Sequence, residues 1–478
     1  MMKSALSDMK KSKADRSMLA VLFTLAGPTI MEQFMQTAVQ YIDTAMVGTL
    51  GTSATAAVGS TTTVNWLVGS TVSAIGVGFL AYIAKEHGSG NLTAVRRASA
   101  QSVLAVLVSG IFFTVLTLSL SPVVPALMQV DKDIRDVASR YFFILYTPML
   151  ARTATIIFGT VLRAVGDTKT PMYAGIAVNT VNVILNFLLI YPTREFYGVT
   201  IWGADLGIEG AAIASAVGFT VGGIIITAAL WSHPLLSPKG EKIRPDREIL
   251  RPCLKVAFPN MLQRFGTCLG YVAFASMINS LGETATAAHT IANTVESAFY
   301  IPGYGMQTAA ATLAGNALGA KDSKMMKDMS RTAIISEVVL MIISGGLLFA
   351  FAPLMMDIFS DSPDVIALGT TVLRMVAVSE PFYGVSIIIE GMMQGVGKTV
   401  KPFVYNITGM WGIRILGTFI FITFLSGTLV SAWGCMIAHN MFLFVLYFVH
   451  MVSGKWNPLR KPKAFSNSDF GLRNSENM

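Results

Sequence analysis

Residues 31–48 read MEQFMQTAVQYIDTAMVG and place an acidic side chain, Asp43, inside an otherwise apolar segment. On a helix that turns about 100° per residue, one narrow stripe holds four polar side chains spaced four, four and three residues apart: Glu32, Gln36, Gln40 and Asp43. An ionisable group inside a membrane span costs at least about 2.5 kcal/mol, so it faces a water-filled cavity or a polar partner rather than lipid. The stripe therefore predicts either a functional site or polar contacts that only join neighbouring helices.

The composition is typical of a polytopic membrane protein. Of the 478 residues, 53% are hydrophobic and 13% are charged. Soluble domains are about 25% charged. The three cysteines are scattered over apolar stretches without the spacing of a disulfide framework or a zinc site. The basic N-terminus leads into a long apolar segment without a small-residue cleavage site, so we expect no cleaved signal peptide.

The distribution of positive charge predicts the orientation in the membrane. The net charge is +8; 27 of the 35 Lys and Arg residues fall in tails and loops assigned to one side, three lie on the opposite side, and five lie in or beside the spans. Cytoplasmic loops carry the excess of Lys and Arg. We therefore expect a multi-pass protein of the cell membrane with both termini and the central loop in the cytoplasm. The net charge alone would suggest a nucleic-acid partner, but its placement in the loops of one side argues against one.

Apolar stretches of about 20 residues are long enough to cross a bilayer. The sequence predicts an all-α polytopic membrane protein with twelve transmembrane helices, at 18–44, 54–84, 98–122, 138–162, 172–192, 208–231, 252–280, 286–316, 331–353, 367–394, 403–425 and 430–453. Residues 232–251 form the expected cytoplasmic linker between an N-lobe at 18–231 and a C-lobe at 252–453. Residues 1–17 and 454–478 are the expected cytoplasmic tails.

The two halves of the chain repeat each other at one constant offset, which sets Pro28 against Pro259. At this offset TLGTSATAA at 49–57 matches SLGETATAA at 280–288, and LRAVGDTKTPM at 162–172 matches MQGVGKTVKPF at 393–403. With six helices per half, both halves have the same orientation. We therefore expect two six-helix bundles related by a pseudo-twofold axis along the membrane normal, with a cavity between them.

Three segments together resemble the multidrug and toxic compound extrusion (MATE) family, in its bacterial or archaeal type. They are PTIMEQFMQTAVQYIDTAMVGTLGTSATAA at 28–57, LRAVGDTKTP with its repeat MQGVGKTVKP, and NVILNFLLIY at 182–191. The resemblance runs from about residue 19 to about residue 452. It implies a secondary active exporter.

The resemblance also implies an ion or proton site around Asp43 in the first helix. Family members add polar residues four apart on the fifth helix and a hydroxyl on the sixth, which here are Asn182, Asn186 and Ser215. Asn186 stands where some members carry a second aspartate. One acid with amide oxygens can bind sodium or hold a proton, so we expect Na⁺ or H⁺ as the coupling ion and no other cofactor or metal. The alternative is that the asparagines only join helices by hydrogen bonds.

A second polar face is predicted in the eighth helix, where His289, Asn293 and Glu296 recur at intervals of four and three. The tenth helix offers Glu380 and Glu390, ten residues apart and nearly on one face. These five side chains are candidates to contact substrate or to titrate, and Glu32, Gln36 and Gln40 join them as candidate cavity residues.

Pro28 and Pro259 each lack the amide that would bond the carbonyl four residues back, so each is a candidate hinge in its helix. The resemblance implies that the first helix bends when its acid is protonated. A static kink in both halves is the alternative.

These features predict a monomeric exporter that works by alternating access in contact with membrane lipid. It would exchange cationic or amphipathic organic compounds for protons or sodium. A flippase or exporter of a lipid-linked or other endogenous compound is the alternative; flippases tend to hold phosphates with central Arg and Lys, whereas most of the polar groups placed here are acids and amides. A channel is a further alternative. The sequence contains no HExxH or GxSxG motif and no clustered Cys and His, so we do not expect an enzyme.

Overall fold

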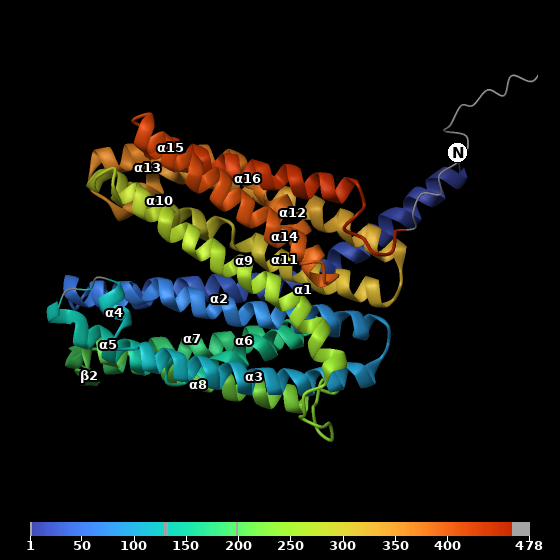
Figure 1. The fold of residues 1–478 in the computed structure, drawn as a ribbon, viewed down its shortest axis with the longest axis horizontal. Coiled ribbons are helices and arrows are strands. Elements are labelled where there is room, and N and C mark those ends of the chain that lie inside the picture. The colour runs from blue at the N-terminus through green and yellow to red at the C-terminus, as the bar shows by residue number, and fades with distance from the viewer. Residues whose placement is uncertain (1, 129, 131, 197–198, 461–478) are drawn as a thin grey trace, which may run out of the picture.

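The computed structural model describes residues 2–128, 130, 132–196 and 199–460 (Figure 1). Within these residues the chain is helical apart from its loops and one antiparallel hairpin of β1 (Pro192–Phe196) and β2 (Val199–Ala204). The first helix begins at Met2, so the described part of the predicted N-terminal tail continues that helix. Residues 461–478 of the predicted C-terminal tail lie outside the described residues.

The described residues of the first half form eight helices before the linker. They are α1 (Met2–Gly48), α2 (Thr52–Gly88), α3 (Leu92–Leu120), α4 (Val124–Leu127), α5 (Lys132–Tyr146), α6 (Met149–Ala164), α7 (Lys169–Leu189) and α8 (Gly207–Ser232). The second half forms α9 (Arg247–Asn279), α10 (Glu283–Phe299), α11 (Ile301–Gly319), α12 (Ser323–Phe359), α13 (Pro363–Gly395), α14 (Val400–Ile407), the π-helix η1 (Thr408–Ile415), α15 (Leu416–Phe424) and α16 (Leu429–Val452). The segment between α8 and α9 coincides with most of the predicted linker.

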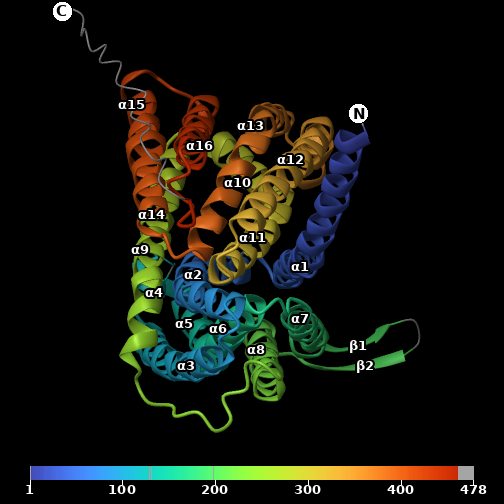
Figure 2. The same cartoon turned by 90° about the vertical axis from the view of Figure 1, so that its right-hand side faces the viewer.

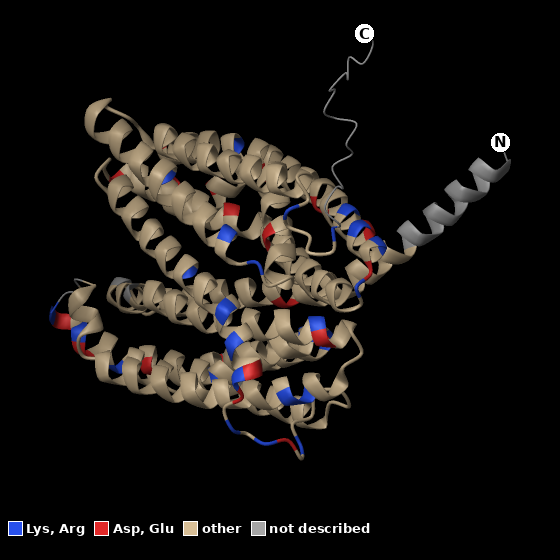
Figure 3. Ribbon diagram, turned by 45° about the vertical axis from the view of Figure 1, so that its right-hand side comes forward, with Lys and Arg blue, Asp and Glu red and all other residues tan. Residues whose placement is uncertain are grey.

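Nine helices of the described chain are long and apolar enough to cross a membrane, and α5 with α6, bent by 49° at their junction, makes a tenth. The segments α9 and α10–α11 bring the set to twelve, which agrees with the number of spans that the sequence predicts. Figure 3 shows Lys, Arg, Asp and Glu only sparsely along the helices, as a lipid-facing bundle requires.

Three predicted spans are not continuous α-helices. The expected helix at 286–316 is two helices that meet at Tyr300, because Pro302 cannot donate the backbone hydrogen bond that would continue α10. The expected helix at 138–162 is bent between α5 and α6, where Pro148 likewise lacks an amide hydrogen. The expected helix at 403–425 contains the π-helical turns of η1. These are corrections to the predicted helices.

The backbone repeats between the halves at the predicted offset. Gly51 before α2 has a φ of 112°, and Gly282 before α10 has a φ of 102°. Gly166 and Gly397, in the loops before α7 and α14, have φ values of 89° and 77°. Only glycine adopts such values without strain, so the repeated glycines keep two pairs of equivalent turns in the same conformation.

The helices form two bundles, one from each half of the chain, that lie side by side in Figures 1 and 2. The first helix of each half also packs against the other half. Leu22, Leu25 and Ala26 of α1 belong to an apolar cluster made mainly of residues 306–456. Ile249 and Cys253 of α9 belong to the cluster of the first half. α1 and α9 therefore each contact both bundles.

We call the end of the bundles where the linker lies the linker end, and the end where β1–β2 lies the hairpin end. At the linker end α2 and α11 touch through their backbones: a Cβ built on Gly88 would lie 2.1 Å from the Asn316 carbonyl oxygen. A Cβ on Gly319 would lie 1.8 Å from the Lys85 carbonyl oxygen. His87 Nδ1 and Asn316 Oδ1 are 3.0 Å apart across the same contact. The ribbons of the two bundles diverge from here towards the hairpin end (Figure 1).

Candidate functional site

Asp43 lies on α1, one turn and a half before the hairpin end of that helix. Asn186 of α7 donates a hydrogen bond from Nδ2 to Asp43 Oδ1 at 2.5 Å, and the same nitrogen lies 3.2 Å from Asn182 Oδ1. Asn182 Nδ2 donates in turn to Ser215 Oγ of α8 at 3.0 Å. The structure therefore brings the four predicted site residues into one hydrogen-bonded row across three helices.

The α7 side of this row follows from its sequence. Asn182 and Asn186 are one helical turn apart, which puts both side chains on the face that meets α1 and α8. Gly218 of α8 allows that approach, because a Cβ there would lie 3.1 Å from the Val178 carbonyl oxygen and 3.5 Å from Asn182 Cβ. Asn186 is fully buried, whereas Asp43 is partly exposed. The hydrogen-bonded row thus joins the buried amide of Asn186 to the partly exposed carboxylate of Asp43.

The row presents oxygen atoms to a small cation. Within the described chain Asn186 Oδ1 is buried without a hydrogen-bond partner, and it belongs to the same amide that donates to Asp43. Carboxylate, amide and hydroxyl oxygens are the ligands that hard cations prefer. A proton on Asp43 could equally be donated to an amide oxygen. The geometry suits either ion.

Glu32 does not share this site. Its Oε2 accepts a hydrogen bond from Arg163 Nη2 of α6 at 2.5 Å, and both side chains are largely buried. Thr312 of α11 donates to the Arg163 carbonyl oxygen at 3.2 Å, so the pair lies where the two bundles meet. Gln36 and Gln40 are exposed. The stripe predicted on the first helix therefore splits into an ion pair, two exposed amides and the Asp43 site.

Sequence reasoning missed Arg163, which it counted among the residues of a loop. At the offset that sets Pro28 against Pro259, Glu32 corresponds to Gln263 and Arg163 to Gln394. The ion pair of the first half is thus replaced by two amides in the second.

Glu390 of α13 bridges those two amides. Gln263 and Gln394 both donate to its Oε1, at 2.8 and 3.0 Å. Asn406 and Tyr447 donate to Oε2, each at 3.2 Å. Four donors therefore surround this carboxyl group and hold it in place.

Glu380 belongs to a different cluster, although the sequence predicted that it shares a face with Glu390. Ten residues separate the two along α13, which is about 15 Å of helix. The Glu380 carboxyl interacts electrostatically with those of Glu296 on α10 and Glu337 on α12, and all three side chains are buried. The prediction that Glu380 and Glu390 lie nearly on one face was therefore wrong, and their roles as substrate or titrating groups stay predictions.

Glu337 was not singled out from the sequence. It is fully buried, and both its carboxyl oxygens lack a hydrogen-bond partner among the residues the structure describes. The available signal was its position as a lone acid within the apolar span predicted at 331–353.

The remaining polar residues predicted on the eighth helix take separate roles. His289 Nδ1 lies 3.2 Å from Trp433 Nε1, which donates to it, and the His289 ring packs edge-on against Phe274. Asn293 is exposed. The structure therefore buries His289 and Glu296 in the second bundle and leaves Asn293 exposed on α10.

Pro28 and Pro259 lie inside α1 and α9, which both continue past them. Each of these helices packs against both bundles. Their role as hinges stays a prediction.

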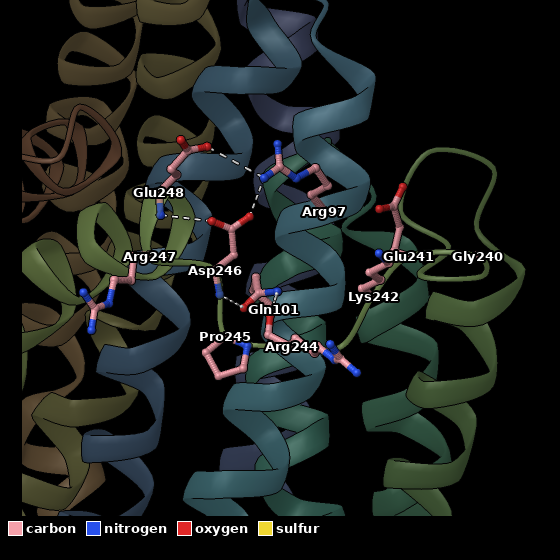
Figure 4. A pocket seen from close by; sticks show the side chains of 10 residues that line it. All are labelled: Arg97, Gln101, Gly240, Glu241, Lys242, Arg244, Pro245, Asp246, Arg247 and Glu248. Atoms are coloured by element: carbon pink, nitrogen blue, oxygen red, sulfur yellow. Dashed lines mark hydrogen bonds and ion pairs between the residues drawn. The ribbon is translucent and has the colours of Figure 1, made fainter.

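A hollow of about 710 Å³ lies far from these sites, at the linker end (Figure 4). The linker is fastened here to α3: Arg97 pairs with Asp246 at 2.5 Å, and Gln101 bonds the backbone of Arg244 and Asp246 at 2.8 and 3.1 Å. Asp246 also caps α9 through the amide of Glu248. These contacts hold the linker against the first bundle.

A family model described as MatE matches residues 28–188 and 259–420. The two matches begin at the paired prolines, Pro28 and Pro259, which confirms the internal repeat predicted from the sequence.

Among curated relatives, the "Probable multidrug resistance protein NorM" of Thermotoga maritima is 26% identical over 435 residues, which cover 91% of this chain and 92% of that protein. The "Multidrug and toxin extrusion protein 2" of Mus musculus is 23% identical over 450 residues, covering 92% of this chain and 75% of that protein.

A solved structure described as "Outward-facing conformation of a multidrug resistance MATE family transporter of the MOP superfamily" matches with a TM-score of 0.84 and 21% identity, covering 93% of this chain and 97% of the other. A MOP superfamily transporter from Pyrococcus furiosus matches with the same TM-score, identity and coverage. Both share the fold of this chain.

Proposed function

The chain belongs to the MatE family of multidrug and toxin extrusion transporters, and on that premise we propose that it is a secondary active exporter of the cell membrane. It exchanges cationic or amphipathic organic compounds for protons or sodium by alternating access. Both termini lie in the cytoplasm, and Asp43 is the group through which the ion acts.

The hydrogen bond between Asn186 and Asp43 is the observation that supports this role. The Asn186 amide can serve both states of the carboxyl group: Nδ2 donates to the ionised form, and the unpartnered Oδ1 can accept from the protonated form or bind sodium. A change of state at Asp43 therefore changes the contact between α1 and α7. Because α1 also packs on the second bundle, this local change can reach the interface between the bundles.

The conformation fits one half of a transport cycle. The bundles touch at the linker end, through α2 with α11 and through Thr312 with Arg163, and their ribbons diverge towards the hairpin end (Figure 1). If the linker end is cytoplasmic, as the charge distribution indicates, this arrangement faces outward. The return step must open the contacts at the linker end.

Efflux from proteoliposomes tests the proposal. A fluorescent lipophilic cation is loaded, and its release is driven separately by an imposed pH gradient and an imposed sodium gradient. We expect one gradient to drive release in the wild type and neither to do so in Asp43→Asn. Glu209→Gln is the matched control, because Glu209 lies at the hairpin end of the same bundle and its one ion pair among the described residues is with exposed Arg140 at 3.3 Å.

If neither gradient drives release from the wild type, or if Asp43→Asn transports like Glu209→Gln, the proposal is contradicted. Translocation of a labelled lipid-linked compound would then be the activity to measure.

A further inference from the structure

Arg414 is a buried cation in the middle of a predicted span of the second bundle. It lies in the π-helix η1 and is 3% exposed. Its guanidinium carbon lies 4.1 Å from the ring centre of Phe274 and 4.9 Å from that of Tyr271. Within the described chain no hydrogen bond or ion pair reaches this guanidinium, and its Nε is buried without a partner. The guanidinium is thus packed against two aromatic rings and has no hydrogen-bond partner among the described residues.

Arg152 in the first bundle shows how a buried arginine is satisfied in this protein. Its guanidinium lies 4.9 Å from the ring centre of Phe219, and its Nη1 donates to Asn65 Oδ1 at 2.6 Å. The residue after Asn65, Trp66, packs edge-on against Tyr271 of α9 with ring centres 5.8 Å apart. The two arginines therefore flank the same contact between α2 and α9. Of the two, Arg152 donates a hydrogen bond to an oxygen atom and Arg414 does not.

The internal repeat sets Arg414 beside the counterpart of the Asp43 site. At the offset of the repeat Phe274 corresponds to Asp43, and position 413, next to Arg414, corresponds to Asn182. The first bundle thus places a carboxylate and amides where the second places an aromatic ring and a guanidinium. Arg414 itself corresponds to Val183, so the guanidinium lies beside the repeated site, and its unpartnered donors suit an anion.

His439 of α16 supplies a further group at this place. It is 5% exposed, and both ring nitrogens are buried without a hydrogen-bond partner in the part of the chain that the structure describes. Its ring abuts η1, where a Cβ on Gly409 would lie 2.4 Å from His439 Cδ2. The imidazole can donate one hydrogen bond to an oxyanion beside the guanidinium.

The other charged group that faces Arg414 is an acid. Glu296 of α10 interacts electrostatically with the guanidinium, as do the rings of His289 and His439, but its carboxyl makes no ion pair with it in the described chain. Glu296 lies in turn beside Glu380. A ligand that brings an anion to Arg414 therefore finds carboxylates nearby for a basic group.

We propose that Arg414 binds the carboxylate of a transported compound that also carries a basic group. The unpartnered guanidinium and the unpartnered His439 ring provide donors, and the neighbouring acids face the positive end of the compound. Arginine suits this role because its planar fork can bond both oxygens of a carboxylate. This inference rests on the proposed exporter function and names a class of substrate for it.

Two dyes that differ by one charge test the assignment. Rhodamine B carries a carboxylate and a cationic ring system, and its ethyl ester carries only the cation. Fluorescence anisotropy of each dye is measured with the purified full-length protein. We expect Arg414→Gln to weaken binding of rhodamine B about tenfold or more, as for loss of a hydrogen bond to a charged group, and to leave binding of the ester within about twofold.

Two further variants sharpen the result. Arg414→Lys keeps the charge without the fork, so we expect an intermediate loss for rhodamine B alone. Arg152→Gln removes the buried arginine of the first bundle, which already donates a hydrogen bond to Asn65. We expect this variant to change the binding of both dyes equally. Unchanged binding of the ester shows that each Arg414 variant is folded.

An equal loss for both dyes, or no selective loss for rhodamine B, would overturn the assignment. Failure of the exporter function gives a different result. The wild type would then show no gradient-driven efflux of the ester, but Arg414→Gln would still weaken the binding of rhodamine B and not that of the ester.

Discussion

Asn186 donates a hydrogen bond to Asp43 at 2.5 Å, and the amide oxygen on the same side chain is buried without a partner in the described chain. The Asn186 amide therefore donates a hydrogen bond to the carboxyl group through Nδ2, and its Oδ1 is free to accept one. This pairing supports the proposed coupling role of Asp43, because Asn186 can respond to either state of its carboxyl group.

Replacing that amide should impair coupled transport. In Asn186→Leu the side chain keeps its approximate size but can neither donate to Asp43 nor accept from it. We expect gradient-driven efflux to fall about tenfold or more, as for loss of a hydrogen bond to a charged group. Asn279→Leu, at an exposed position near the end of α9, is the control. Equal efflux rates in the two variants would contradict this role.

Breaking the pair of Glu32 and Arg163 should destabilise the protein. Arg163→Ala leaves a buried carboxylate without its cation, which costs about 3–5 kcal/mol. Arg140→Ala, which breaks an exposed pair with Glu209, should cost at most about 1 kcal/mol. Apparent melting temperatures of the purified variants measure the difference, and similar shifts for both would contradict it.

The second half suggests a rescue of that pair. The counterparts of Glu32 and Arg163 are Gln263 and Gln394, which are both neutral. We therefore expect the double variant Glu32→Gln with Arg163→Gln to melt at a higher temperature than Arg163→Ala, because no unpaired charge remains. A double variant that is no more stable than Arg163→Ala would show that charge is not the cause.

A side chain at Gly319 should separate the bundles at the linker end. The Cβ of Gly319→Val would meet the Lys85 carbonyl oxygen, so α2 and α11 cannot keep their backbone contact. Spin labels at the exposed positions 91 and 321 should report a longer distance by double electron–electron resonance. Gly346→Val is the control, because a Cβ there meets no atom within 4 Å. The same distance in both variants would contradict the contact.

His233, in the linker, should make stability depend on pH. Burial lowers the pKa of His233, against the opposing charge of Asp167. The neutral ring accepts a hydrogen bond from the amide of Leu235 through Nδ1 at 3.2 Å. Because the folded pKa lies below the unfolded value, this residue stabilises the fold above the unfolded pKa of about 6.5 and loses that contribution as the pH falls through the folded pKa.

The melting temperature of the wild type should therefore fall more steeply between pH 7.5 and 5 than that of His233→Gln, which cannot titrate. Parallel curves for the two proteins would show that His233 contributes no such dependence.

The fold was predictable where the sequence carries a local or repeated signal. The length of the apolar stretches predicted the membrane spans. The offset between Pro28 and Pro259 predicted the repeat of the two halves, and the paired family matches confirm this repeat. The break at Tyr300 had a signal in Pro302, but the length of the apolar run outweighed it. The bundle contacts of α1 and α9 had no such signal, because they join segments from opposite halves of the chain.

The site was predictable in part for the same reason. Asn182 and Asn186 share a helical face, so their proximity follows from spacing. The partner of Glu32 could not be found this way, because Arg163 is 131 residues away. Glu380 and Glu390 are ten residues apart, which is about 80° around the axis of α13 as well as about 15 Å along it, so periodicity itself separates them and different helices surround each.

The most direct measurement of coupling is the affinity of the purified protein for a lipophilic cation, taken as a function of pH at fixed sodium and of sodium at fixed pH. If Asp43 binds the coupling ion, affinity in the wild type falls as that ion increases, and affinity in Asp43→Asn does not change with either ion. Linkage requires the cation to weaken ion binding by the same factor. Identical ion dependence in the wild type and Asp43→Asn would contradict the assignment of Asp43 as the coupling site.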